Sequence, residues 1–287
     1  MALSTLSGDE QRILFVQLCN LLDPGIAVAL ASVSNELRTA THAPLQQLKA
    51  GHHAAAALCR KLGHRKCKAL REAKQVDWYN KGLTADELKL LGSLGSVLPA
   101  LKTLTLCEPA AGPDGGRQLA AGLGAGALPA VTWFRISGTR VGDAGASALA
   151  AALGQGALPR LTSLALSSAA IGDAGLVALA PALRRLPALE RLSLGVNPIG
   201  DEGLAALVAP PPAAGAPPTT TGGLAQLKWL DLSNTQITDA GCATLAAALD
   251  SGALPALKQL YLTGIPASAT AKAAVREAAK PRAAVSW

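Results

Sequence analysis

Cysteine and histidine, residue types that often bind zinc, gather in one short stretch of this 287-residue chain. His53, Cys59, His64 and Cys67 lie within HHAAAALCRKLGHRKC. Structural zinc sites pair their ligands at short, characteristic spacings, and this stretch matches none of them. A basic helix with incidental cysteine and histidine side chains accounts for the stretch, so we predict neither a metal site nor a cofactor.

Four aspartates recur in the same local setting and are the next candidates for acid–base chemistry. Asp143, Asp173, Asp201 and Asp239 each follow a valine or isoleucine by two residues and precede a glycine by two. A carboxylate at the start of a helix accepts hydrogen bonds from its free N–H groups, so we interpret these residues as caps of the helices that they begin. All four histidines precede residue 65. We therefore predict no nucleophile–His–Asp set and no enzymatic activity.

These aspartates belong to a repeat that indicates the fold. In residues 158–185, leucines alternate along a short strand, and Leu179 and Leu183 then lie on one face of a helix. Such self-similarity is typical of stacked repeats. A stretch close to Leu-Pro-x-Leu-x-x-Leu-x-Leu starts at six positions, which are Leu98, Leu128, Leu158, Leu186, Leu224 and Leu254.

A seventh, degenerate unit precedes these six. One repeat cannot bury its apolar face alone, whereas seven stacked units share a continuous core. We predict an α/β solenoid over residues 70–280, with parallel strands on the concave face and helices on the convex face. A Pro/Gly-rich insert at 208–223 is expected to form a loop, and 281–287 a C-terminal tail. The degenerate unit is recognised by Leu70, Val76, Trp78, Leu83 and Leu91.

The LxxLxL run, followed by I-G-D-A-G and by leucines four apart, resembles the ribonuclease-inhibitor-like class of leucine-rich repeat. This resemblance covers about residues 70 to 280. It implies a curved, right-handed solenoid that binds a protein on its concave side. The asparagine that usually follows the last strand leucine by three residues remains only as Asn197. We therefore expect fewer buried hydrogen bonds and looser turns at the other repeats.

Alternation along each strand leaves every second side chain outside the core. Of the eight aromatic residues in the chain, four fall at such outward positions, where core burial does not explain them. Because tryptophan, tyrosine and arginine are enriched in binding hot spots, we predict a partner-binding stripe there. Packing between neighbouring strands is the alternative reason to keep these aromatic side chains. The predicted stripe is Trp133, Arg135, Arg191, Trp229, Asp231 and Tyr261.

The first 45 residues are expected to form separate helices, followed by a basic connecting helix at 46–69. Asp23-Pro24 fits the end of one helix and the start of another. Residues 6–38 resemble an F-box, with Ile13 and Leu14 in its first helix, which implies docking to a Skp1-type adaptor of a ubiquitin ligase. Alternatively, these helices only cap the N-terminal end of the solenoid. The resemblance assigns adaptor binding to Leu21, Leu22, Asp23, Pro24, Leu30, Val33 and Leu37.

Charge and hydropathy narrow the class of protein. The net charge is +7, but residues 98–271 are neutral overall, and the excess lies at the ends. The basic run could meet nucleic acid, an acidic protein or an import receptor. A solvated helix face is the simpler interpretation, and we do not predict nucleic-acid binding. The densest basic run comprises Arg60, Lys61, Arg65, Lys66, Lys68, Arg71 and Lys74.

No apolar run reaches the roughly 18 residues that suggest a membrane span. The acidic N-terminus does not look like a secretory signal, and five cysteines without a CxxC pair suit a reducing compartment. We therefore expect a cytoplasmic location, with a nuclear one as the alternative.

These observations predict a non-enzymatic protein–protein interaction module that binds its partner on the concave face. An F-box-type substrate receptor of a ubiquitin ligase is the first alternative. A GTPase-activating repeat protein is the second, although no residue pattern singles out that activity.

Overall fold

The computed structural model describes residues 7, 15, 20–33, 35–209 and 224–287. The side chains at positions 36, 37, 40 and 113 are outside this description, as is the expected insert from position 210 to 223. Two compact units divide the chain. The first comprises residues 1–73 with 97–100, and the second comprises residues 74–96 with 101–287.

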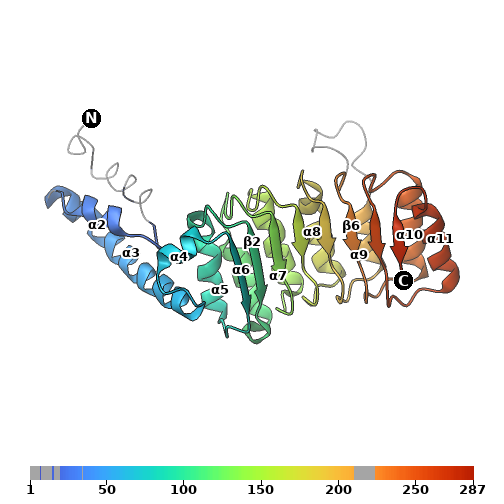
Figure 1. Cartoon of the computed structure of the whole chain (residues 1–287), viewed down its shortest axis with the longest axis horizontal. Helices are drawn as coiled ribbons and strands as arrows, with labels where there is room; N and C mark the ends of the chain where they lie inside the picture. The colour runs from blue at the N-terminus through green and yellow to red at the C-terminus, as the bar shows by residue number, and fades with distance from the viewer. Residues whose placement is uncertain (1–6, 8–14, 16–19, 34, 210–223) are drawn as a thin grey trace. The chain divides into compact units, whose positions relative to one another are not determined.

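Parallel strands in chain order form the sheet of the second unit (Figure 1). Each strand pairs only with the strands of its neighbouring repeats, as expected when one repeat stacks on the next. The eight strands of the described residues are β1 (Gln75–Tyr79), β2 (Thr103–Cys107), β3 (Trp133–Ile136), β4 (Ser163–Ala165), β5 (Arg191–Ser193), β6 (Trp229–Asp231), β7 (Gln259–Tyr261) and β8 (Ala284–Ser286).

Helices cover one face of this sheet and leave the other face open (Figure 1). Between successive strands the described residues form one α-helix, so strand and helix alternate through the unit. The predicted α/β solenoid is therefore confirmed. The helices are α5 (Ala85–Ser93), α6 (Gly112–Gly122), α7 (Gly142–Gly154), α8 (Asp173–Arg184), α9 (Asp201–Val208), α10 (Asp239–Asp250) and α11 (Ala269–Ala279), with short 3-10 turns η2 (Leu94–Val97) and η3 (Pro109–Ala111).

The core of the second unit consists of thin layers of leucine between the sheet and the helices. In β4, Leu164 is buried, and in α8 both Leu179 and Leu183 are fully buried, as the repeat pattern predicts. The degenerate repeat packs in the same way, because Val76 and Trp78 of β1 are also buried. Small, regular side chains thus let each repeat share its core with the next.

The recurrent aspartates cap helices, but each caps the following helix rather than its own. Asp143 accepts a hydrogen bond from the backbone N–H of Gly172, just before α8, at 2.7 Å. Asp173 accepts from Gly200 and Gly203 of the next repeat at 2.7 and 2.9 Å. This corrects the assignment of each aspartate to the helix that it begins. The same contact between repeats recurs from Asp201 to Thr238 and from Asp239 to Ser268.

The same contact explains three of the four glycines that follow these aspartates by two residues. A Cβ atom at Gly175 would lie 2.5 Å from Oδ1 of Asp143, and one at Gly203 would lie 2.6 Å from Oδ1 of Asp173. A Cβ atom at Gly241 would collide with Oδ1 of Asp201. These three glycines therefore leave room for the aspartate of the repeat before them, whereas a Cβ atom at Gly145 would lie 2.7 Å from Cγ1 of Val141.

Buried polar side chains also hold the turns that follow the strands. Asn197 donates to the carbonyls of Leu166 and Leu194, and its oxygen accepts from the N–H groups of Ala169 and Ile171. It therefore also satisfies the turn of the preceding repeat, which has alanine at the asparagine position. In the first full repeat, the fully buried Glu108 accepts from the backbone N–H groups of residues 81 to 83. Sequence reasoning overlooked Glu108, since it stands one position before the usual one.

The C-terminal end of the chain differs from the expected tail. Residues Ala284–Ser286 form β8, which pairs in parallel with β7. Lys272 and Arg276 of α11 lie 5.8 and 5.9 Å from the ring centre of Trp287. Ala284–Ser286 therefore extend the sheet by one strand, where the sequence predicted a tail.

The first unit is helical, as predicted. Its helices are α2 (Gly25–Ala31), α3 (Asn35–Lys61) and α4 (Cys67–Glu72). The expected boundary at residue 45 falls inside α3, so one helix joins the two regions that the sequence suggested. Among the described residues, no helix of the chain is both long and apolar enough to cross a membrane.

Candidate functional site

The outward-facing side chains of β3 to β7 form two parallel rows on the open face of the sheet. The strand register aligns Trp133, Ser163, Arg191, Trp229 and Gln259 in one row. In the second row, the register aligns Arg135, Ala165, Ser193, Asp231 and Tyr261. The six residues of the predicted stripe therefore lie on four of these five strands.

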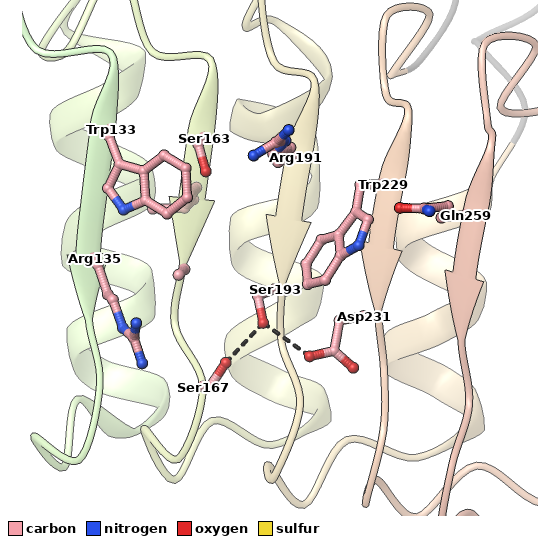
Figure 2. Close-up of a pocket in the computed structure, with 11 residues that line it drawn as sticks. Trp133, Arg135, Ser163, Ser167, Arg191, Ser193, Trp229, Asp231 and Gln259 are labelled. Atoms are coloured by element: carbon pink, nitrogen blue, oxygen red, sulfur yellow. Dashed lines mark hydrogen bonds between the residues drawn. The ribbon is translucent and has the colours of Figure 1, made fainter. Parts of the chain in front are cut away.

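A hollow of about 500 Å³ opens on these rows (Figure 2). Five of the six predicted residues line it, namely Trp133, Arg135, Arg191, Trp229 and Asp231. The sixth, Tyr261, is outside the lining. Alternation along the strands also places further lining residues on this face, outside the six of the predicted stripe. They are Ser163, Ala165, Ser167, Ser193 and Gln259.

One wall of the hollow is a cation–π pair. The guanidinium of Arg191 lies 6.0 Å from the ring centre of Trp133, on a strand two positions away in the sheet. The intervening β4 carries only the small, buried Ser163 in that row. This small side chain lets the arginine reach the indole, which remains 37% exposed. Such a pair holds both side chains in place while leaving the ring available for contact.

On the opposite side of the hollow, Trp229 forms an aromatic pair with Tyr261, which itself lies outside the lining. The rings of Trp229 and Tyr261 are 5.3 Å apart and inclined at 48°. They lie diagonally across β6 and β7, because the register places Tyr261 opposite Asp231. Packing between strands therefore explains in part why aromatic residues occupy these two outward positions. Both rings are only half-buried, so they also contribute surface to the open face.

Hydroxyl groups link the floor of the hollow to Asp231 (Figure 2). Ser193 donates to Oδ2 of Asp231 at 3.0 Å, so Ser167, at 2.7 Å, donates in turn to Ser193. The other carboxylate oxygen accepts from the backbone N–H of Ser233 at 2.9 Å. A Cβ atom at Gly195 would lie 2.9 Å from Oδ2, so glycine leaves room for this carboxylate. Asp231 is thus a fixed acceptor with both oxygens engaged.

The two arginines of the hollow are held without a salt bridge to any described residue. Arg135 donates through Nε to the neutral hydroxyl of Ser137 at 3.1 Å. Neither Arg135 nor Arg191 forms an ion pair with any residue that the structure describes. Guanidinium groups held in this way can recognise carboxylates through paired hydrogen bonds.

The predicted adaptor-binding residues of the first unit do not share one exposed face. Leu22 is buried, and Leu21 and Leu30 pack against the cluster formed by Phe15, Ala27, Ala31 and Leu48. Val33 is 68% exposed. Pro24 directly precedes α2, and Asp23 forms an ion pair with Arg71 at 3.4 Å. Ile13, Leu14 and the side chain of Leu37 lie outside the described residues.

The cysteine and histidine stretch forms a thiol pair. Cys59 and Cys67 are buried and hydrogen-bonded to each other, while His53 is exposed. Burial raises the pKa of the Cys59 thiol to about 12, and the neighbouring Cys67 adds to this effect. Among the residues described, no group of three or more histidine, cysteine, aspartate or glutamate side chains could hold a metal ion.

Comparison with protein families matches three segments of the second unit. Residues 158–180, 186–208 and 227–246 match the family model described as Leucine Rich repeat. The chain therefore carries leucine-rich repeats. No curated protein matches it. Its placement in the ribonuclease-inhibitor-like class and the F-box resemblance stay predictions.

Several solved structures are partly similar to this chain. An internalin-like protein of Listeria monocytogenes is 14% identical, with a TM-score of 0.41 and coverage of 75% of this chain and 55% of that one. A leucine-rich-repeat protein of Leptospira interrogans is 16% identical, with a TM-score of 0.33 and coverage of 70% and 57%. Actin-binding site 2 of leiomodin-1 is 14% identical, with a TM-score of 0.37 and coverage of 45% and 73%. This chain spans little more than half the length of the two bacterial proteins.

Proposed function

We propose that this leucine-rich-repeat chain is a non-enzymatic interaction module that binds a protein partner on the open face of β3 to β7. The observation that carries the proposal is the hollow of about 500 Å³. It gathers two tryptophans, two arginines and a fixed carboxylate on neighbouring strands of a regular sheet. Tryptophan and arginine anchors in a hollow with a small, polar floor are typical of binding hot spots.

The chemistry of the hollow favours binding over catalysis. A serine becomes a nucleophile when an adjacent base removes its proton, and histidine usually has that role. The lining described for this hollow contains no histidine, lysine or cysteine. Asp231 holds Ser193 in place, but its oxygens are already engaged by Ser193 and Ser233. The serines therefore serve as a polar floor that can exchange hydrogen bonds with a partner.

The charges of the hollow suggest the chemistry of the contacting segment. Arg135 and Arg191 lack ion pairs among the described residues, whereas Asp231 is satisfied. A partner segment that places a carboxylate near these arginines and an apolar side chain on Trp133 or Trp229 would complete both kinds of contact.

Paired purification of the full chain and its variants tests this function. We expect the double variant Trp133→Ala, Trp229→Ala to lose the specific partner, since each truncation at a hot spot should cost about 2 kcal/mol of binding free energy. Tyr79→Ala is the matched control, because Tyr79 is an exposed aromatic residue of β1 outside the hollow. Thermal unfolding checks that the variants fold. An unchanged set of captured proteins, or equal loss in the control, would contradict the proposal.

An F-box-type adaptor contact is a second candidate, and exposed apolar side chains of the first unit favour it. Ile26 is 62% exposed, Val28 40% and Val33 68%. If this surface docks a Skp1-type adaptor, Ile26→Asp and Val33→Asp should abolish co-purification of that adaptor with the full chain. Since both side chains are largely outside the core, the variants should remain folded. Absence of adaptor from the wild-type preparation would remove this candidate.

A further inference from the structure

A hollow of about 370 Å³ lies in the first unit, lined by the turn before α2, the end of α3 and the start of α4. Four cationic side chains line it, namely Arg60, Arg65, Lys66 and Lys68. Its carboxylate is Asp23, and the apolar part of its lining includes Leu22. The volume lies within the range of about 300 to 1,000 Å³ that is usual for small-molecule sites.

Three of these cations have no partner among the described residues. Arg60, Arg65 and Lys66 are exposed and form neither an ion pair nor a side-chain hydrogen bond there. Lys68 pairs only loosely with Glu72, at 3.7 Å and with both side chains exposed. Asp23 already pairs with Arg71 at 3.4 Å. Positive charge therefore predominates in the hollow.

The helix dipole of α3 accounts for only part of this charge. Basic residues in the last turn of a helix are favourable there, and Arg60 and Lys61 occupy that turn. Arg65 and Lys66 come after the end of the helix, and neither side chain donates to a helix carbonyl within the described part of the chain. Capping of α3 thus leaves two cations of the hollow without a structural role.

The segments that carry these cations are held in place. Between α3 and α4, the backbone N–H of His64 donates to the carbonyl of Cys59 at 2.8 Å, and that of Gly63 donates to Arg60 at 3.0 Å. The hydrogen-bonded pair of Cys59 and Cys67 brackets the same turn.

The opposite wall is also fixed. Nδ1 of His52 lies 2.6 Å from the carbonyl oxygen of Leu21, so this nitrogen donates. A Cβ atom at Gly51 would lie 2.6 Å from Cδ2 of Leu21, which shows how closely the turn packs on α3. The backbone that carries the cations is therefore held in place before a ligand binds, which lowers the free energy lost on binding.

We propose that this hollow binds a compact, multiply charged phosphate compound. Arginine presents paired donors that match phosphate oxygens, and lysine adds a compact positive charge. The four cations surround one hollow instead of following a stripe, and the described lining contains no tryptophan, tyrosine or phenylalanine to stack on a base. These two features favour a small anion over a nucleic acid, whose recognition uses extended basic tracks and stacking.

Calorimetric titration of the full chain with tripolyphosphate tests the proposal. The triple variant Arg60→Gln, Arg65→Gln, Lys66→Gln should weaken binding at least about tenfold, because it removes three charge-assisted contacts. The matched control is Arg140→Gln, Arg160→Gln, Arg185→Gln, which removes three exposed arginines of the second unit. The control should change the affinity less than about twofold. Rising salt should weaken wild-type binding.

Further arms of the titration distinguish the sources of phosphate. No binding of tripolyphosphate, or equal loss in both triple variants, would overturn the proposal. In a second outcome, a single-stranded oligonucleotide binds more tightly than tripolyphosphate and loses that binding in the first triple variant. That outcome would identify nucleic acid as the ligand in place of a small anion. Binding only to vesicles that contain a phosphoinositide would replace it with a membrane surface. Trp133→Ala should leave the titration unchanged, so this test is independent of the partner-binding proposal.

Discussion

Two ladders of polar side chains join neighbouring repeats of the second unit, one on the helix side and one at the turns after the strands. The helix-side ladder uses the same residue each time, an aspartate that caps the following helix, and its contacts lie mostly at exposed positions. The turn ladder changes from repeat to repeat, with Glu108, Thr139 and Asn197, and all three of these side chains are buried.

A residue that recurs in every repeat therefore need not contribute more stability than one that varies. Water can replace the partner of an exposed carboxylate, whereas an unsatisfied buried amide or carbonyl loses its hydrogen bond without replacement. We therefore expect the varied turn ladder to contribute more stability per residue than the regular aspartate ladder.

The largest expected effect follows from Asn197→Ala, which removes a residue of the turn ladder. Backbone groups of two successive turns would lose their partners in the core. We expect the free energy of unfolding to fall by about 3 kcal/mol, measured by chemical denaturation. Gln236→Ala, at an exposed position of the same unit, is the control and should change it by less than about 0.5 kcal/mol. Equal effects would remove the contrast between the ladders.

A smaller effect is expected for Gly241→Ala, which adds a Cβ atom against Asp201 of the previous repeat. Overpacking of this kind costs about 1 to 3 kcal/mol. In the Asp201→Ala background the clash with the carboxylate disappears, so the added cost of Gly241→Ala should fall. A double-mutant cycle measures this coupling. Gly154→Ala is the control, since nothing lies within 4 Å of a Cβ atom there. Additive costs would mean that the glycine has another role.

The smallest expected effect is a pH dependence of the last aspartate contact. Hydrogen bonds from the backbone and side chain of Ser268 lower the pKa of Asp239, and Lys272 adds to this. A lowered pKa in the folded state means that the contribution is complete above the usual aspartate pKa of about 4 and is lost as the pH falls through the lowered value. The stability difference between wild type and Asp239→Asn should therefore narrow below about pH 4. A difference that is constant from pH 6 to pH 2 would contradict this.

The fold could be predicted from the sequence because the regular spacing of the leucines defines the strand and the helix of each repeat. The buried side chains of β1, including Trp78, follow from offsets alone. Sequence spacing could not predict which helix each aspartate caps. The first N–H groups of its own helix and those of the next helix are equally plausible partners for its carboxylate. Glu108 was overlooked for a related reason, since it stands one position from the expected asparagine.

The outward rows of the sheet were predictable for the same periodic reason. Strand alternation alone predicts that Trp133 and Trp229 lie on the open face. The contact between Arg191 and Trp133 depends on the small side chain of Ser163 on the strand between them. The repeat pattern did not predict this contact. The basic hollow of the first unit could not be predicted, since it depends on how α3 and the turn at Leu21 pack without a repeat to guide them.

The contact between an aspartate and a glycine of the following repeat makes the repeats compatible units, because one repeat can carry both halves of the contact. Residues 171–198 carry both an aspartate for the next repeat and a glycine that accommodates the one before. A tandem duplication of this length would bring its own compatible joint at both ends. Unequal recombination could therefore lengthen or shorten such an array without inventing a new interface, while a crossover out of phase would separate the two partners and be eliminated.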